Sequence, residues 1–263
     1  MNPRTQGRAY AASKAAQRQH ATVDGQQIAY VKAGEGSPAI VFLSGANMDL
    51  DSWFLVYPEA AKISSALAFD RPGVGRSGPP TAEQTAATVV VTMRSLLQQV
   101  SVEPPYLLVA HSLGGLIANL CARVFPCEVS GLVLVDAASP AEVEAQPTPG
   151  PAMGVINRAL GMIAGGRGRG RLREVDVVDQ TLRQIAAAPP FPDVPLVVVT
   201  GTKRMRFVPG VAFAAHLAHQ ARLADLSPRG RQVFAPNSGH FPQLNDPEIV
   251  LDAIREVVAT DRT

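Results

Sequence analysis

Short apolar runs alternate with helical patterns along most of the chain. AIVFL (39–43), YLLVA (106–110) and GLVLV (131–135) hold almost only apolar residues, which is typical of strands buried on both faces of a sheet. Similar but less uniform runs lie at 65–69, 195–199 and 231–235. TVDGQQIAYVKAG (21–33) alternates around a Val-Asp-Gly turn, which predicts an antiparallel hairpin.

Helical patterns fill the spaces between these runs. Thr81, followed three positions later by Gln84, resembles a capping box and predicts a helix from there to about Val100. Pro104 and Pro105 then end it. Further helices are expected directly after Ser112 and in two later segments, 211–224 and 246–259.

This alternation predicts an α/β fold with a mostly parallel eight-stranded sheet and helices on both faces. Residues 20–136 and 195–263 form the expected core, and 1–19 an N-terminal extension. Segment 137–194 breaks the alternation after the sixth strand: it is rich in Pro, Gly and Ala, with helical patches near 152–164 and 174–187. It is expected to form a helical lid above the sheet.

Composition excludes several classes of protein. The chain has 263 residues and a formal net charge of +2, so its overall charge points to neither a nucleic-acid nor a membrane partner. GGRGRGRLR (165–173) is short and isolated, and we interpret it as a basic loop. No apolar stretch reaches the ~18 residues of a membrane span, and no metal or cofactor motif is present. Cys121 and Cys127 are expected to be packing residues without a disulfide.

The N-terminal extension is basic and lacks the apolar centre of a secretion signal. We therefore expect a soluble, cytoplasmic protein, although a signal already removed would leave no trace.

The stretch VAHSLGG (109–115) places a serine between a predicted strand and a predicted helix. A tight turn there needs small residues two positions either side, and Ala110 and Gly114 satisfy this. The helix that follows points its free N–H groups toward Ser112, which favours a developing anion. By itself the pattern fits either an ordinary turn or a nucleophile.

Four segments together resemble the α/β-hydrolase superfamily. AHSLGG is similar to its nucleophile elbow, with Ala110 in the place of the first glycine. FLSGANMD (42–49) resembles the oxyanion loop, with Ser44 in place of the usual His. FDRPGVGRSG (69–78) and NSGHFPQLNDPE (237–248) resemble the loop after the fourth strand and the histidine segment. The resemblance covers roughly residues 21–260 and implies that Ser112 is a nucleophile.

A serine hydroxyl needs a base to take its proton. The resemblance implies His240 as base and then acid. The other histidines are given no role in the reaction: His111 is expected to pack beside the serine, His216 and His219 to be surface or core residues of a helix, and His20 to lie in the N-terminal extension.

The third member of the expected triad departs from the family pattern. The usual acid follows the strand written PLVVVTG, but Arg204 stands there and residues 195–224 contain no Asp or Glu. Asp136 directly follows GLVLV, a place that some members of the superfamily use. We expect it to hold and orient His240, although an aspartate here also occurs in relatives with the usual acid.

The backbone N–H groups of Leu113 and Ala46 are the expected oxyanion hole, with Asn47 as a substitute or supplement. Asp70 and Arg71 are expected to hold the DRPG loop. Basic residues Lys203, Arg204 and Arg206 are interpreted as solvated surface charges.

A serine at the elbow, where haloalkane dehalogenases and epoxide hydrolases carry a carboxylate, predicts an acyl-enzyme. The chain is therefore expected to be a serine hydrolase of a small carboxylic ester or similar acyl bond, with a small-molecule substrate and no cofactor. The alternatives are a ligand-binding or receptor protein on the same scaffold, and a cofactor-free perhydrolase or lyase. The apolar residues of the expected lid (Val143, Met153, Ile156, Leu160, Met162) suggest that the substrate contains an acyl or aromatic group.

Overall fold

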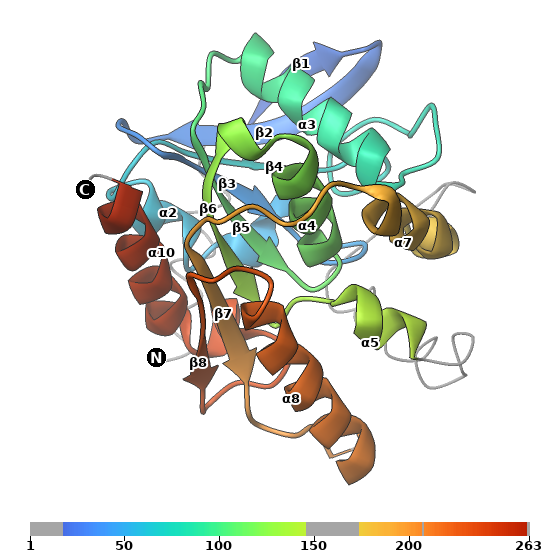
Figure 1. Ribbon diagram of the computed structural model, residues 1–263. Helices are drawn as coiled ribbons and strands as arrows, with labels where there is room; N and C mark the ends of the chain where they lie inside the picture. The colour runs from blue at the N-terminus through green and yellow to red at the C-terminus, as the bar shows by residue number, and fades with distance from the viewer. Residues whose placement is uncertain (1–17, 146–173, 207, 262–263) are drawn as a thin grey trace.

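The structure is a computed structural model that describes residues 18–145, 174–206 and 208–261 (Figure 1). These residues form one eight-stranded sheet in the order β1-β2-β4-β3-β5-β6-β7-β8. β1 and β2 are antiparallel to their neighbours, and the strands from β4 to β8 are parallel. The predicted fold class is confirmed. The strands are β1 (Gln19–Val23), β2 (Gln26–Ala33), β3 (Ala39–Leu43), β4 (Ala66–Phe69), β5 (Tyr106–His111), β6 (Val129–Val135), β7 (Leu196–Gly201) and β8 (Gly230–Ala235).

The first two strands form the expected hairpin. Val23 pairs with Gln26 across a two-residue turn, and Asp24 and Gly25 both have positive φ, of 47° and 78°. A turn with positive φ at both central residues matches the twist of the flanking strands. His20 lies within β1, so its assignment to the N-terminal extension is wrong.

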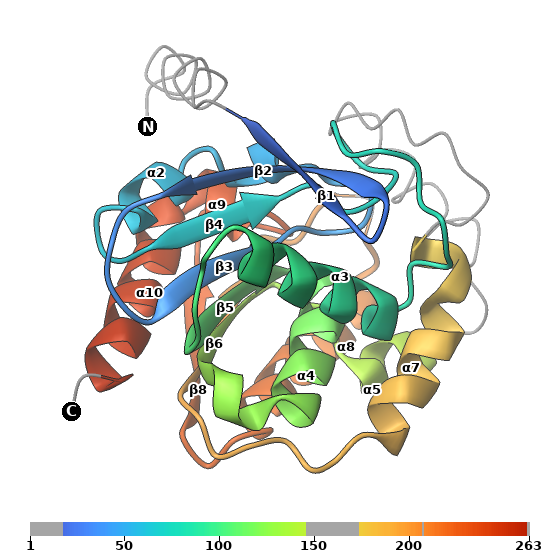
Figure 2. The same ribbon diagram turned by 90° about the horizontal axis from the view of Figure 1, so that it is seen from above.

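Helices cover both faces of the sheet (Figure 2). On one face lie α3 (Ala86–Gln99), α4 (Gly114–Val124) and α8 (Gly210–Ala224); on the other lie α2 (Tyr57–Ala60) and α10 (Pro247–Asp261). α9 (Pro242–Asn245) packs beside α10. Because the central strands are buried on both faces, they contain apolar residues without alternation. None of the helices in the described part of the chain is long and apolar enough to cross a bilayer.

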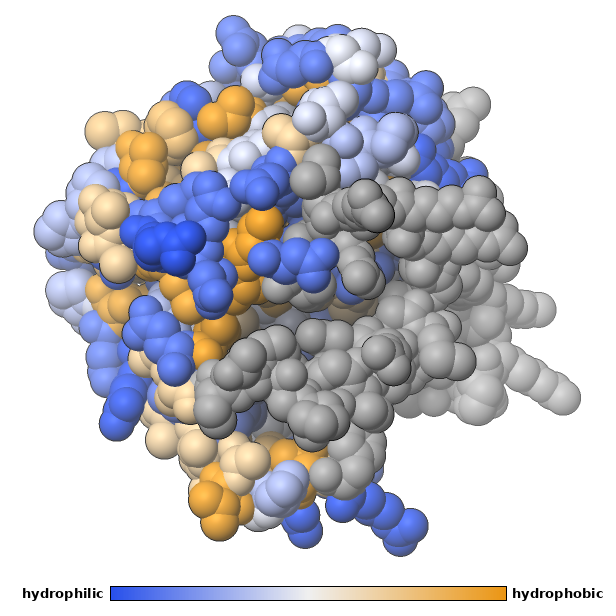
Figure 3. Space-filling model, turned by 90° about the vertical axis from the view of Figure 1, so that its right-hand side faces the viewer, coloured by the Kyte–Doolittle hydropathy of each residue, from blue (hydrophilic) through white to orange (hydrophobic). Residues whose placement is uncertain are grey.

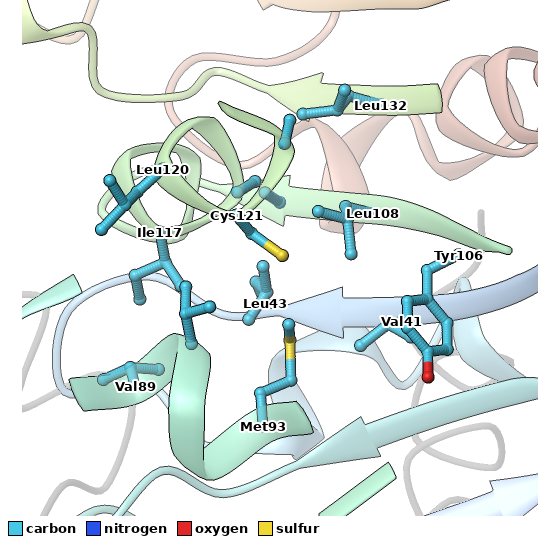
Figure 4. Close-up of a cluster of buried hydrophobic side chains, with 14 of the residues drawn as sticks. Val41, Leu43, Val89, Met93, Tyr106, Leu108, Ile117, Leu120, Cys121 and Leu132 are labelled. Carbon is cyan, nitrogen blue, oxygen red and sulfur yellow. The ribbon is translucent and has the colours of Figure 1, made fainter. Parts of the chain in front are cut away.

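The larger core lies between the sheet and helices α3 and α4 (Figure 4). Met93 of α3 and Cys121 of α4 point toward Leu43 and Leu108 of the central strands, and all four are almost fully buried. Cys121 therefore packs as expected, and both cysteines are free. Cys127 is exposed, so its expected packing role is wrong; it lies in a 3₁₀ turn beyond the end of α4.

The start of α3 differs from the prediction. The helix begins at Ala86 with Thr85 as its N-cap, whose side chain accepts a hydrogen bond from the Thr88 N–H. Gln84 instead donates from its side chain to the carbonyl of Ala82, so the predicted capping box at Thr81 does not form. Thr85 is also a good cap, and the competing motif four residues earlier concealed it.

The segment between β6 and β7 is helical where the structure describes it. It contains α5 (Pro140–Glu144), the 3₁₀ turn η3 (Glu174–Val177) and α7 (Val178–Ala187), and the last two confirm the helical patch expected at 174–187. The helical patch near 152–164, the GGRGRGRLR loop and residues 1–17 lie outside the described residues. Figure 3 views the side on which α5, α7 and α8 lie, where hydrophobic and hydrophilic residues are intermixed. That this segment acts as a lid stays a prediction.

Candidate active site

Ser112 lies in a tight turn between β5 and α4. Its φ is 50°, in the left-handed region that non-glycine residues rarely adopt. Three backbone hydrogen bonds hold this conformation: Ser112 donates to the carbonyl of Val135 at 3.3 Å and accepts from Gly115 and Ala138 at 2.9 Å each. The turn therefore presents the serine side chain at the carboxyl end of the central strand, where ligands bind in open α/β sheets.

The small residues around Ser112 are required by close packing. A Cβ placed on Gly114 would lie 2.3 Å from the carbonyl oxygen of Leu43, and one on Gly115 would lie 2.6 Å from the Cβ of Ala137. Ala110 is fully buried. The start of α4 therefore approaches β3 so closely that no side chain fits at position 114.

His240 contacts both other members of the expected triad. Its Nε2 lies 3.1 Å from Ser112 Oγ and its Nδ1 lies 2.7 Å from Asp136 Oδ2. Because a carboxylate only accepts, Nδ1 donates and Nε2 is left to accept from the serine hydroxyl. The loop that carries His240 is held by Asp246, which accepts from the backbone and side-chain N–H groups of Asn237.

Asp136 directly follows β6 and is 3% exposed. Its Oδ1 accepts from the backbone N–H of Gly201 at 3.0 Å. Burial of the carboxyl acts to raise its pKa, but hydrogen bonds from His216 and His240 outweigh this, so the pKa of Asp136 lies well below its usual range. The carboxylate is therefore charged at neutral pH. Arg204, at the usual place of the acid, is exposed and donates to the carbonyl of Val208.

The end of β7 supplies a backbone donor and close packing instead of an acid. A Cβ placed on Gly201 would lie 1.8 Å from the carbonyl oxygen of Gly239. This contact brings the end of β7 against the histidine loop, while the Gly201 N–H binds Asp136. Asp136 after β6 and Gly201 of β7 therefore both contact the loop that carries His240.

His216 is the residue of this site that the sequence did not reveal. Its Nε2 lies 3.2 Å from Asp136 Oδ1 and its Nδ1 lies 2.8 Å from Glu142 Oε1 of α5. It lies partly exposed on α8, as expected of a surface or core residue, but these two contacts were not expected. Nothing in its Ala-rich surroundings signals this contact, which joins segments far apart in the chain. His219, one turn further along α8, is partly exposed.

His111 supports the backbone of the loop that carries His240. It is fully buried, and its Nε2 donates to the backbone carbonyl of His240 at 2.7 Å. Burial, and to a lesser extent the neighbouring His240, lower the pKa of His111 to about 3, so the ring is neutral. Its expected packing role is confirmed, and it also holds the backbone of the histidine loop.

The expected oxyanion loop lies against the serine. A Cβ placed on Gly45 would be 3.2 Å from Ser112 Cβ and 2.9 Å from His111 Nδ1. Ala46 follows Gly45 directly, and Asn47 has a φ of 55°. Leu113, whose N–H is the other expected donor, is the N-cap of α4.

Arg71 holds the expected oxyanion loop through its backbone carbonyls. Its guanidinium donates to the backbone carbonyls of Ser44 and Gly45, both at 2.7 Å, and forms a buried ion pair with Glu174. Asp70 accepts from the backbone N–H groups of Leu50 and Arg76. The expectation that these two residues hold the DRPG loop is confirmed, and Arg71 reaches further than expected.

Ser44 replaces the histidine usual in this loop and has a structural place. It is buried, and its Oγ accepts a hydrogen bond from Trp53 Nε1 at 3.0 Å. Within the described residues, no group of three or more His, Cys, Asp or Glu side chains is arranged to hold a metal ion.

Comparison with known proteins agrees with this architecture. Residues 38–181, more than half of the chain, match the family model described as alpha/beta hydrolase fold. The chain therefore belongs to the α/β-hydrolase fold family.

Individual relatives are more distant. An uncharacterised protein from Mycobacterium tuberculosis is 28% identical over 92% of this chain and 81% of its own length. An uncharacterised protein from Bacillus subtilis is 34% identical over 41% of this chain, and the match spans only 42% of that relative. Among solved structures, a thermophilic esterase from Thermogutta terrifontis superposes with a TM-score of 0.66 and 21% identity, covering 94% of this chain and 100% of the esterase. At that identity the likeness shows the fold alone.

Proposed function

We propose that the protein is a serine hydrolase that cleaves a small carboxylic ester or similar acyl bond. The observation that carries the proposal is the hydrogen-bonded chain from Ser112 Oγ through His240 to Asp136. This is the arrangement that a nucleophile, its base and an orienting acid require. Membership of the alpha/beta hydrolase fold family supports the same reaction class.

In the proposed reaction, Ser112 Oγ attacks the acyl carbon while His240 Nε2 takes the hydroxyl proton. The N–H groups of Leu113 and Ala46 stabilise the tetrahedral oxyanion. The C–O bond to the leaving alcohol then breaks, and His240 returns the proton to that oxygen. Water, activated by His240, attacks the acyl-enzyme in the same way and releases the carboxylic acid.

Asp136 keeps the proton of neutral His240 on Nδ1, so that Nε2 is free to act as base, and stabilises the imidazolium that forms. The backbone N–H of Gly201 donates to the Asp136 carboxylate and holds it in place. Asp136 thus takes the part that an acid after β7 plays in most relatives.

Release of nitrophenol from short-chain nitrophenyl esters tests the proposal. Ser112→Ala is expected to lower kcat by at least about a thousandfold, whereas Ser95→Ala in α3 leaves it unchanged. A fluorophosphonate probe is expected to label the wild-type protein and not Ser112→Ala. A protein that neither turns over esters nor takes the label contradicts the proposal.

The same assays separate the alternative functions. A ligand-binding protein would bind without turnover, and its structural basis would be an Asp136 turned away from His240; here the two are 2.7 Å apart. A perhydrolase would show peroxide-dependent bromination. The ligand-binding alternative rests on the missing acid after β7, whose part Asp136 takes in the proposed hydrolase; no observation of its own favours the perhydrolase.

A further inference from the structure

His216 lies between two carboxylates. On one side is Asp136, and on the other is Glu142, at 3.2 Å and 2.8 Å from its two ring nitrogens. A neutral imidazole has a single N–H and would turn a lone pair toward one of these carboxylates. Only the imidazolium donates to both.

The electrostatics of the cluster agree with this geometry. Burial acts to lower the pKa of His216, but the hydrogen bonds and charges of Asp136 and Glu142 outweigh it and raise that pKa to about 10. His216 therefore carries a proton throughout the neutral range. The side chain is 20% exposed, so solvent screens the pair only in part.

We propose that His216 is a positioning residue of the active site, whose imidazolium, held by Glu142, fixes the Asp136 carboxylate and offsets part of the negative charge that His240 experiences. The proposal rests on the proposed hydrolase function. It extends the Ser112–His240–Asp136 chain by two further members that come from α8 and from the segment between β6 and β7.

The effect of replacing His216 depends on the groups that face the rings of His216 and His240. Asp136 and Glu142 face His216; Asp136, Ser112 and the neutral His111 lie next to His240. When His216 is replaced by a neutral side chain, a positive charge near His240 disappears while Asp136 stays negative. The imidazolium form of His240 becomes more favourable, so the enzyme must reach a higher pH before its base is free.

Steady-state kinetics of His216→Gln across pH 5 to 9 test this. The acidic limb of the kcat/KM profile is expected to move up by about one pH unit, and kcat on the plateau to fall about tenfold with little change in KM. Glu142→Gln removes a negative charge instead and leaves His216 facing Asp136, so the limb should move by less and in the opposite direction. The matched control, His219→Gln on the same helix, should leave profile and plateau as in the wild type.

Imidazole nitrogen NMR gives a readout that needs no turnover. Both ring nitrogens of His216, assigned by their loss in His216→Gln, are expected to be protonated at pH 8. The pH midpoint of the His240 resonances should be higher in His216→Gln than in the wild type. These two measurements decide the proposal even if no ester is cleaved, an outcome that would contradict the hydrolase function separately.

Two results would overturn the inference. One is a His216 ring that titrates near the ordinary value of about 6.5. The other is an acidic limb and a His240 midpoint that stay in place in a folded His216→Gln protein; a purely structural role would reduce activity equally at all pH values.

Discussion

Two side chains of the proposed triad sit on backbone that is costly to form. Ser112 and Asp136 have φ values of 50° and 43°, and a non-glycine residue in this region costs on the order of 1 kcal/mol. Both follow central parallel strands directly, so the left-handed turn aims each side chain over the end of the sheet. The surrounding close packing maintains this strain.

Gly114 gives a direct test of that packing. Gly114→Ala is expected to lower the free energy of unfolding by about 3 kcal/mol, because its Cβ would lie 2.3 Å from the Leu43 carbonyl oxygen. Chemical denaturation followed by circular dichroism measures the change. Gly210→Ala, at a position with open space around it, is the matched control and should change stability by less than about 0.5 kcal/mol; equal effects of the two substitutions would contradict this account.

The site residues differ in how much sequence information each one carries. Ser112 and His240 lie in local motifs, so a short stretch was enough to predict their positions. Asp136 was predicted because the usual acid was missing and another strand end offered a carboxylate. His216 and Glu142 lie on separate helices, and their contact depends on how α8 and α5 pack, which no local pattern encodes.

At the scale of helices and strands, two threonines compete as the N-cap of α3: Thr81, expected from the sequence, and Thr85, found in the structure. Thr85→Ala is expected to destabilise the protein by about 1 kcal/mol, because it removes the cap that accepts from Thr88. Thr81→Ala, which alters the predicted cap on an exposed side chain, should have almost no effect. Urea unfolding of both variants decides between the two positions, and a larger loss for Thr81→Ala would mean that the helix starts earlier.

The strands were easier to predict than the helix ends. Apolar runs that are buried on both faces have no other common explanation in an alternating chain, and every predicted strand is present with its ends shifted by a few residues at most. Helix starts depend on which of several neighbouring caps engages. The start of α3 was wrong because Gln84 turns back to the carbonyl of Ala82.

At the scale of the whole molecule, His111 links stability to pH. Burial lowers its pKa to about 3 in the folded state, against about 6.5 when unfolded, so the unfolded chain binds the extra proton between these values. Its contribution is fully present above about pH 6.5 and is lost as pH falls toward 3. Protonated His216 adds no slope in this window, because its pKa is raised to about 10 and it binds a proton in both states below about pH 6.5.

This effect can be measured as the slope of the unfolding free energy against pH. From pH 6 to 4, wild-type unfolding free energy should fall by up to about 1.4 kcal/mol per pH unit more than that of His111→Gln. Denaturant titrations at several pH values measure this slope. His20→Gln, on the exposed part of β1, should keep the wild-type slope; a His111→Gln protein with the same slope would show that this ring does not govern acid sensitivity.

The ion pair between Arg71 and Glu174 has a consequence for building chimeras. The Arg71 guanidinium joins the loop beside Ser112 to the carboxylate of Glu174, about a hundred positions later in the segment between β6 and β7. A foreign segment grafted between β6 and β7 would leave the buried guanidinium of Arg71 without a counterion, unless that segment carries an acid at the position of Glu174. A chimera that exchanges this segment is therefore expected to keep the loop beside Ser112 in place only if it retains an acid at the position of Glu174.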